Sequence, residues 1–544
     1  MSSDQAVTSG QTNTSESSQR SSAGARRLFR ASSTVSTMTM ISRVMGLLRD
    51  NCIAHALGDS HVADAFFVAF KVPQFLRRLF AEGAFSQAFV PVLSEYRVNG
   101  TQAAVKELVD RVCGCLGIVL MGITIPIVVF APAFTMVFAP GFYFHSPEKF
   151  ALASEMVRIT FPYLLLISLT GFAGAILNSY DRFAVPAFTP VLLNVSLIFA
   201  ALVMMPWFDQ PVYALAWGVM IAGVLQMVFQ LPFLAQIHMM PRPKVDFQHE
   251  GVKRILTLML PALFGVSVGQ INLFLDTIIA SFLPDGSIAR LYYADRLYEL
   301  PLGVIAIAVS TVILPSLSRD FAKQDFTQFS AKLDWSLRTM LLLSLPAAFA
   351  LIVLAKPILI TLFGYGSHWS ENGMQISAFC LQAFSMGLLA FMLIKVLVPG
   401  YYARQDMKTP VRIGIISMIS NMVLNLIIVT PLHFYFDLGV VGLALASTLA
   451  AFINMGLLLK GLLDNGIYQF APGWKTLLWR MIIASLTMCL VLWGMMHFMT
   501  GWVAWPWYER VFNLTVLCLT GFLVYFGVLF SCGMRYSDFY LHMD

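Results

Sequence analysis

The chain has 544 residues, of which 58% are hydrophobic and only 12% are charged, and its formal net charge is +6. This composition excludes an ordinary soluble domain and is typical of a helical protein that crosses a membrane many times. The seven cysteines lack the spacing of a zinc site or a disulfide framework, so we expect no metal and no cofactor.

Apolar runs separated by turn residues divide most of the chain. Residues 1–32 come first; they are rich in Ser, Thr, Gln and Gly without apolar periodicity, which predicts a disordered cytoplasmic tail. The remainder predicts an all-α polytopic membrane protein with about fourteen spans. Their expected limits are 33–57, 62–93, 108–136, 152–177, 187–206, 212–236, 254–283, 290–317, 334–363, 373–399, 411–430, 438–462, 476–499 and 511–533.

The basic residues of the connections predict the orientation. Lys and Arg gather in one set of alternate connections, whereas the other set holds only Lys149 and Arg510. The positive-inside rule therefore places the basic set, with both termini, in the cytoplasm. This placement accounts for the positive charge without a nucleic-acid partner.

The first two spans form a hairpin around the turn Gly58-Asp59-Ser60 that carries an unusual density of charge. An ionised side chain that faces lipid at bilayer depth costs about 2.5–3.5 kcal/mol. Interhelical salt bridges with snorkelling arginines are one interpretation, but the number of charges favours a polar cavity. Helical phase leaves open which of Arg77 and Arg78 points inward. The charged residues are Arg43, Arg49, Asp50, Asp64, Lys71, Arg77, Arg78 and Glu82.

The charged hairpin recurs 226 residues later, where Asp50–Asp59 aligns with Asp276–Asp285 and Phe66-Phe67 aligns with Tyr292-Tyr293. Six spans separate the copies, so both enter the membrane in the same sense, as in transporters built from parallel repeats. We expect two parallel six-helix lobes and two additional C-terminal helices. The expected limits are 33–240 for spans 1–6, 241–465 for spans 7–12 and 466–544 for spans 13–14 with the C-terminal tail.

The second copy is also charged. Arg296 and Glu299 lie three residues apart on one helix, so a local ion pair is as compatible with the pattern as a substrate contact. Lys395 in span 10 is a further intramembrane cation, with snorkelling to the cytoplasmic end as the alternative. The charges of the copy are Asp276, Arg290, Asp295, Arg296 and Glu299.

Five segments give the chain a resemblance to the MurJ (MviN) lipid II flippases of the MOP exporter superfamily. The segments are SRVMGLLRD at 42–50, ADAFFVAFKVP at 63–73, LRRLFAEGAFSQAFVP at 76–91, YYADRLYELP at 292–301 and PGYYARQDMKTPV at 399–411. The resemblance implies a MATE-like architecture in the bacterial inner membrane. It also implies substrate-binding residues, which are Arg43, Arg49, Asp64, Arg77 and Arg296, and it thereby favours Arg77 over Arg78. Supporting residues are Asp50, Lys71, Arg78, Glu82, Asp295, Glu299 and Lys395.

The implied substrate is lipid II, undecaprenyl-pyrophosphate-linked disaccharide pentapeptide. Arginine suits its diphosphate because the planar guanidinium binds two oxygens at once and stays charged in a low dielectric. We expect a monomeric transporter that contacts membrane lipids and exposes the head group to alternate sides. No Walker-type GxxxxGK[ST] segment is present. A coupling cation would favour a carboxylate on span 11, where only the neutral Asn421 and Asn425 occur.

Three alternatives stay open at this point. A flippase for another polyprenyl-linked oligosaccharide, of the O-antigen type, would use similar chemistry, and a MATE-like drug exporter would favour carboxylates and aromatics over arginines. A membrane enzyme acting on polyprenyl phosphates would need an acidic metal-binding cluster at a membrane face. Its best candidate is Asp246, His249 and Glu250, which are more simply explained as a solvated loop.

Overall fold

The computed structural model describes residues 37–79, 85–366, 368–370 and 372–535, and within these ranges every regular element is a helix. The predicted tail, 1–32, and the predicted supporting residue Glu82 lie outside the described residues. The helices pack as two compact units. Of the described residues, the first unit holds 37–49, 76–79, 85–129 and 159–263, and the second holds 50–75, 130–158 and the remainder from 264 onward. The division passes through the charged hairpin, and the predicted lobe boundaries stay a prediction.

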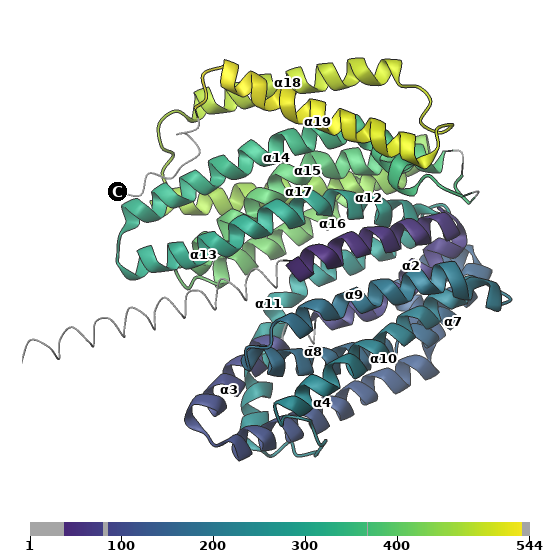
Figure 1. Cartoon of the computed structure of the whole chain (residues 1–544), viewed down its shortest axis with the longest axis vertical. Helices are drawn as coiled ribbons and strands as arrows, with labels where there is room; N and C mark the ends of the chain where they lie inside the picture. The colour runs from purple at the N-terminus through teal and green to yellow at the C-terminus, as the bar shows by residue number, and fades with distance from the viewer. Residues whose placement is uncertain (1–36, 80–84, 367, 371, 536–544) are drawn as a thin grey trace, which may run out of the picture. The chain divides into compact units, whose positions relative to one another are not determined.

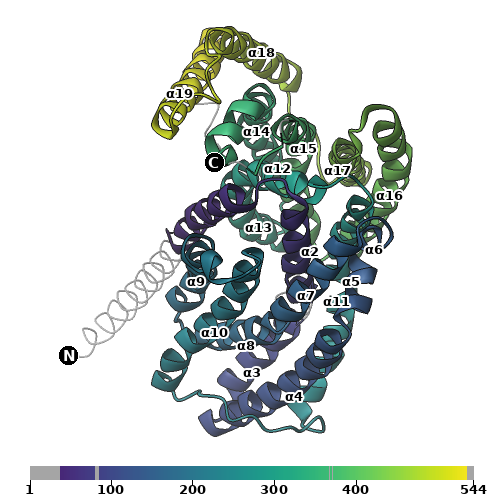
Figure 2. The same ribbon diagram turned by 90° about the vertical axis from the view of Figure 1, so that its right-hand side faces the viewer.

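The first unit is organised around α8, which packs against α3, α4, α9 and α10 (Figure 2). Its helices are α3 (Ser86–Asn99), α4 (Gln102–Val129), α8 (Tyr163–Ser179), α9 (Ala184–Phe199), α10 (Val212–Gln236) and the start of α11 (Glu250–Ser281), with the short η2 (Ala200–Met204) and η3 (Met205–Trp207) after α9.

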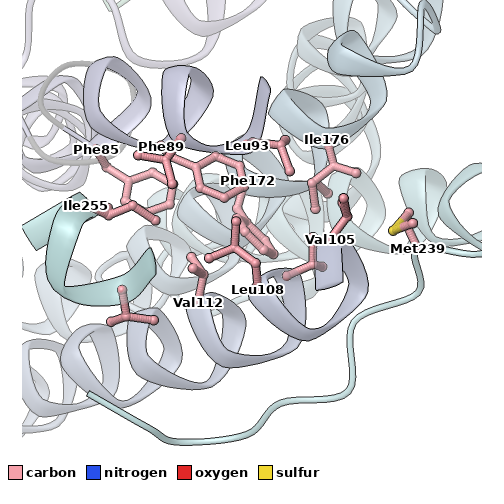
Figure 3. Packing of buried hydrophobic residues seen from close by; sticks show 14 of the residues in the cluster. Phe85, Phe89, Leu93, Val105, Leu108, Val112, Phe172, Ile176, Met239 and Ile255 are labelled. Atoms are coloured by element: carbon pink, nitrogen blue, oxygen red, sulfur yellow. The ribbon is translucent and has the colours of Figure 1, made fainter. Parts of the chain in front are cut away.

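Aromatic side chains form much of the core of this unit. Phe89 of α3 packs on Phe172 of α8 with ring centroids 5.1 Å apart, and Phe85 stacks on Phe89 at 5.3 Å. Leu108 of α4 and Ile255 of α11 belong to the same cluster (Figure 3). Because these residues are buried, the packing fixes α3 beside α8.

In the second unit, α14 packs on α15 and α15 on α17, which pairs with α16. Helices α18 and α19 lie side by side along α14 (Figure 1). The helices are α2 (His61–Leu76), α5 (Ala131–Phe138), α6 (Pro140–His145), α7 (Pro147–Thr160), α12 (Ser287–Pro301), η4 (Leu302–Ala306), α13 (Ile307–Ala322), α14 (Phe326–Phe363), α15 (Gly373–Tyr402), α16 (Lys408–Phe436), α17 (Gly439–Asp464), α18 (Trp474–Phe498) and α19 (Trp507–Ser531).

Ten helices in the described part of the chain are long and apolar enough to cross a membrane. They match ten of the predicted spans, and α10 has the predicted limits of 212–236. The predicted spans outside this set are 1, 2, 7 and 8, which are the charged hairpin and its copy. The all-α membrane fold is therefore confirmed, whereas the number of fourteen spans stays a prediction.

The hairpin copies share a feature that the sequence did not predict. Span 2 was expected over residues 62–93, with Pro73 able to bend or re-phase it; α2 ends at Leu76, and residues 77–79 are π-helical. In the second copy α12 ends at Pro301, and the π-helix η4 follows from Leu302. Pro73 and Pro301, which lack an amide hydrogen, precede the two turns and disturb the local hydrogen-bond ladder. Such turns are frequent at functional sites, and Arg77 lies on the first of them.

Candidate functional site

Arg296 of α12 lies at the centre of a charged cluster in the second unit. Its guanidinium pairs with Glu299 at 3.2 Å and with Asp50 at 3.5 Å, and its Nε donates to the Tyr292 hydroxyl at 3.2 Å. The side chain is about a third exposed. Tyr292 donates from the same hydroxyl to Asp50 at 3.0 Å. The structure thus contains the Arg296–Glu299 ion pair that the sequence allowed, and it adds Asp50 as a second acidic partner.

Asp64 of α2 is the most completely satisfied of the predicted site residues. Lys149 of α7 donates to its Oδ2 at 2.7 Å, and the backbone N–H groups of Gly286 and Ala289 donate to its two oxygens at 2.7 and 2.9 Å. Both amides belong to the beginning of α12, where the helix dipole favours an anion. Only 1% of Asp64 is exposed, so in this conformation its carboxylate is engaged by the protein itself.

Arg49 is also buried, in the first unit. Its NH1 donates to Asn194 Oδ1 of α9 at 3.0 Å, and Asn194 Nδ2 donates to the carbonyl of Ser42 at 3.0 Å. The asparagine therefore links two successive turns of the helix over residues 37–57. It holds the guanidinium through a neutral acceptor.

Arg43, Arg77 and Arg78 differ in exposure. Arg43 is half-buried, and no residue of the described ranges forms an ion pair with it. Arg77 is half-buried on the π-helical turn, whereas its neighbour Arg78 is exposed. This difference favours Arg77 as the inward-facing residue.

The predicted supporting residues fall into two groups. Lys71 of α2 and Asp295 of α12 are half-buried and interact electrostatically, and Asp276 also acts on Lys71. These residues, with Asp50, Glu299 and Arg296, belong to the second-unit cluster. Lys395 of α15 is exposed and shares a helical face with Phe391, which packs on Tyr298 of α12 at 5.5 Å. Lys395 therefore lies on the face of α15 that is directed toward α12.

A second buried acid, Asp276 of α11, is held by amides. Asn421 and Asn425 of α16 donate to its Oδ1 at 3.1 and 2.9 Å. These two asparagines are the neutral residues of span 11, and they contact a carboxylate that span 7 supplies. In the described part of the chain, no three His, Cys, Asp or Glu side chains form a group that could hold a metal ion.

Three charged contacts were missed at the sequence level. Lys149 was placed in a connecting loop, but it is 3% exposed and contacts both Asp64 and Asp285. Arg290 pairs with Asp59 at 2.7 Å. Arg510, which is also buried, donates to four backbone carbonyls. Lys149 and Arg510 are the two basic residues in the connections predicted to lie outside the cytoplasm, where the positive-inside rule predicts few. Their presence there was the sequence signal for a structural role.

The loop before α11 does not form the metal cluster that a membrane enzyme would need. Asp246 pairs with Arg111 of α4, and His249 Nδ1 accepts from the backbone N–H of Gly251 at 3.2 Å. Nearby, the hydrogen bond from Arg254 lowers the pKa of the exposed Glu95 carboxyl. These contacts are those of a loop attached to the first unit by ion pairs.

The helical architecture defines a transporter fold of the MATE type. The chain is similar to an inward-facing multidrug resistance MATE family transporter of the MOP superfamily, with a TM-score of 0.65 and 15% identity over 80% of this chain and 97% of that one. At this identity the likeness shows the fold alone. A solved lipid II flippase MurJ in an inward closed conformation is nearer, with a TM-score of 0.75 and 28% identity over 91% and 97% of the two chains.

Sequence comparison identifies the family. The family described as "Lipid II flippase MurJ" matches residues 53–512. A probable lipid II flippase MurJ of Vibrio cholerae is 45% identical over 94% of this chain and 98% of its own length, and the lipid II flippase MurJ of Burkholderia cenocepacia is 44% identical over 94% and 99%. The chain belongs to the MurJ family, as its motifs predicted.

Proposed function

We propose that this chain translocates lipid II from the cytoplasmic to the outer leaflet of the bacterial inner membrane. The observation that carries the proposal is the family match over residues 53–512. The charges on helices that are otherwise built for a membrane support it, because an anionic head group needs such charges to cross the bilayer. The family consists of transporters, so the MurJ identity favours transport over the membrane-enzyme alternative. The sequence relatives reported above are named lipid II flippases, which favours this substrate over the O-antigen and drug-export alternatives.

In this proposal the arginines bind the diphosphate of the substrate while its polyprenyl tail stays in lipid. Arg43, Arg49, Arg77 and Arg296 supply planar guanidinium groups, and each charge-assisted contact to phosphate contributes about 1.5–3 kcal/mol. The acidic partners of Arg296 keep the empty site from being purely cationic. Rocking of the lobes 33–240 and 241–465 would expose the head group to either side in turn.

The membrane potential is a sufficient source of energy for an anionic cargo. Moving one negative charge out of an inside-negative cell releases about 2.3 kcal/mol per 100 mV. We infer a monomer with both termini in the cytoplasm, surrounded by membrane lipids and without a nucleic-acid partner. The segment 466–544, which includes α18 and α19, adds a lipid-facing helix pair.

Depletion and complementation test the proposal. A bacterium depleted of its own lipid II flippase receives the wild-type chain, Arg43→Ala, or Arg412→Ala as the control for an exposed arginine outside the site. We expect the wild type and the control to restore exposure of lipid II on the outer leaflet and Arg43→Ala to fail at equal membrane abundance. Rescue by Arg43→Ala would reject the site, and failure of the wild type would reject the substrate.

A further inference from the structure

The two hairpin copies meet in the second unit through equivalent residues. Phe67 and Tyr293 occupy the same position in the repeat, 226 residues apart. Their rings touch edge to face with centroids 5.5 Å apart. For two repeats related by a rotation of 180°, a residue meets its own equivalent beside the rotation axis, as in an isologous interface. A local pseudo-twofold axis therefore passes next to this aromatic pair.

This axis requires the contacts around it to occur in pairs, and one pair is electrostatically mismatched. Arg290 contacts Asp59 at 2.7 Å across the axis. The equivalents of these two residues are Asp64 and Asp285, so the symmetric contact would place two carboxylates together. Like charges in such a position repel each other, and the second contact needs a cation that the repeat does not supply.

Lys149 of α7 supplies this cation. Its Nζ lies 2.7 Å from Asp64 Oδ2 and 2.9 Å from Asp285 Oδ1, and it also lies 4.2 Å from the centroid of the Phe142 ring. Lys149 and Asp64 are almost completely buried, whereas Asp285 is 59% exposed. A buried carboxylate that loses the cation paired with it is strongly destabilised. Lys149 thus converts a repulsive contact between the copies into an attractive one.

The contacts of Asp64 divide according to the repeat to which they belong. Lys149 and Asp64 both precede the second copy in the sequence, and α6, directly before α7, contacts that copy through the Gly141 N–H and Ser281 Oγ at 3.0 Å. Separation would break the contact of Lys149 with Asp285. It would also break the hydrogen bonds that the backbone N–H groups of Gly286 and Ala289 donate to Asp64. Under the predicted topology these residues lie at the outer end of the hairpin.

We propose that Lys149 is a positioning residue that latches the outer ends of the two hairpin copies through Asp64 and Asp285, and thereby stabilises the conformation closed toward the outside. The latch opens when the copies separate and the groups that the latch buries are transferred to water. The proposal depends on the predicted orientation of the chain and not on the identity of its cargo.

Thiol labelling from outside the cell tests the latch without any substrate. Ser287 is 2% exposed at the start of α12, so Ser287→Cys in a full-length chain without its native cysteines reports opening of the outer seam. A membrane-impermeant maleimide is added to spheroplasts, and the labelling rate is measured. We expect Lys149→Met to raise the rate at least about tenfold, because removal of one partner of a buried pair shifts the equilibrium by this amount or more.

Three further variants separate a latch from general damage to the fold. Lys332→Met is the matched control, because Lys332 pairs with Asp320 at 2.8 Å elsewhere in the second unit, and it should leave the rate unchanged. Lys149→Arg should restore slow labelling, since it keeps the cation. Adding Asp285→Asn to Lys149→Met should reduce the rate, because it removes the repulsion between the carboxylates.

Labelling of Lys149→Met at the wild-type rate would overturn the proposal. Equal rates for Lys149→Met and its double variant with Asp285→Asn would also overturn it, because damage to the fold is not repaired by a second substitution. If Lys149→Met does not accumulate in the membrane, Lys149→Gln serves in its place and the same outcomes decide. If the variants label as expected but the wild-type chain does not transport lipid II, the proposed function is rejected and the latch stands.

Discussion

Replacing Arg510 is predicted to loosen the C-terminal helix pair from α14. The guanidinium is 7% exposed and donates to four backbone carbonyls. Val503 and Trp505 in the turn before α19 each accept at 2.8 Å, and Gly364 and Ile360 at the end of α14 accept at 2.8 and 3.2 Å. The last carbonyls of a helix lack partners within the helix, and a cation at this end is additionally favoured by the helix dipole.

The magnitude follows from the carbonyls that lose their donor. An unsatisfied buried acceptor costs about 1–3 kcal/mol. The Ile360 carbonyl also accepts from the Gly364 backbone N–H at 3.0 Å, so the loss falls mainly on the other three carbonyls. We therefore expect Arg510→Met to lower the free energy of unfolding by about 3–5 kcal/mol. Arg510→Lys should recover part of this loss, since an ammonium keeps the charge but offers fewer donors in a different geometry.

Equilibrium unfolding in mixed detergent micelles measures this difference. Arg412→Met is the control, because Arg412 is exposed on α16, and its effect should stay within about 0.5 kcal/mol. An Arg510→Met protein as stable as the wild type would refute the inference that this arginine attaches the turn before α19 to α14.

Further substitutions test other parts of the structure. Gly286 has a φ of +85°, and a Cβ there would lie 2.1 Å from the Asp59 carbonyl oxygen, so Gly286→Ala should lower the thermal midpoint; an unchanged midpoint would contradict this close approach. Asp276→Leu removes the acceptor of Asn425 and one of the two acceptors of Asn421, whose other acceptor is Asn272, and should cost about 2–4 kcal/mol in the micelle unfolding assay; a loss near zero would contradict this role of Asp276. Arg77→Ala should reduce complementation more than Arg78→Ala at equal abundance, and the reverse order would exclude Arg77 as the inward-facing residue.

Much of the fold was predictable because membrane helices follow simple physical rules. The turn at residues 58–60 and the limits of α10 agree with the sequence analysis, since apolar length and turn residues determine both. The repeat was predictable from the spacing of acidic and aromatic residues. Phe67 and Tyr293, which are equivalent in the repeat, are in contact, so the two copies pack against each other through matching positions.

The sequence did not predict how the charges are paired. The partner of Asp64 is Lys149, 85 residues away, and only the packing of α7 brings it there. The π-helical turn that carries Arg77 was also missed, because a shift of the backbone ladder depends on tertiary contacts as well as on a proline. The choice of Asn194 as the partner of Arg49 likewise follows from the packing of α9.

Transport by the purified protein tests the central claim most directly. The wild-type chain is reconstituted in liposomes that contain lipid II in the inner leaflet, and the appearance of the head group outside is followed with a membrane-impermeant probe. We predict that the wild type exposes the substrate faster than protein-free liposomes and that Arg296→Ala does not. Equal exposure with and without the wild-type protein would contradict the account.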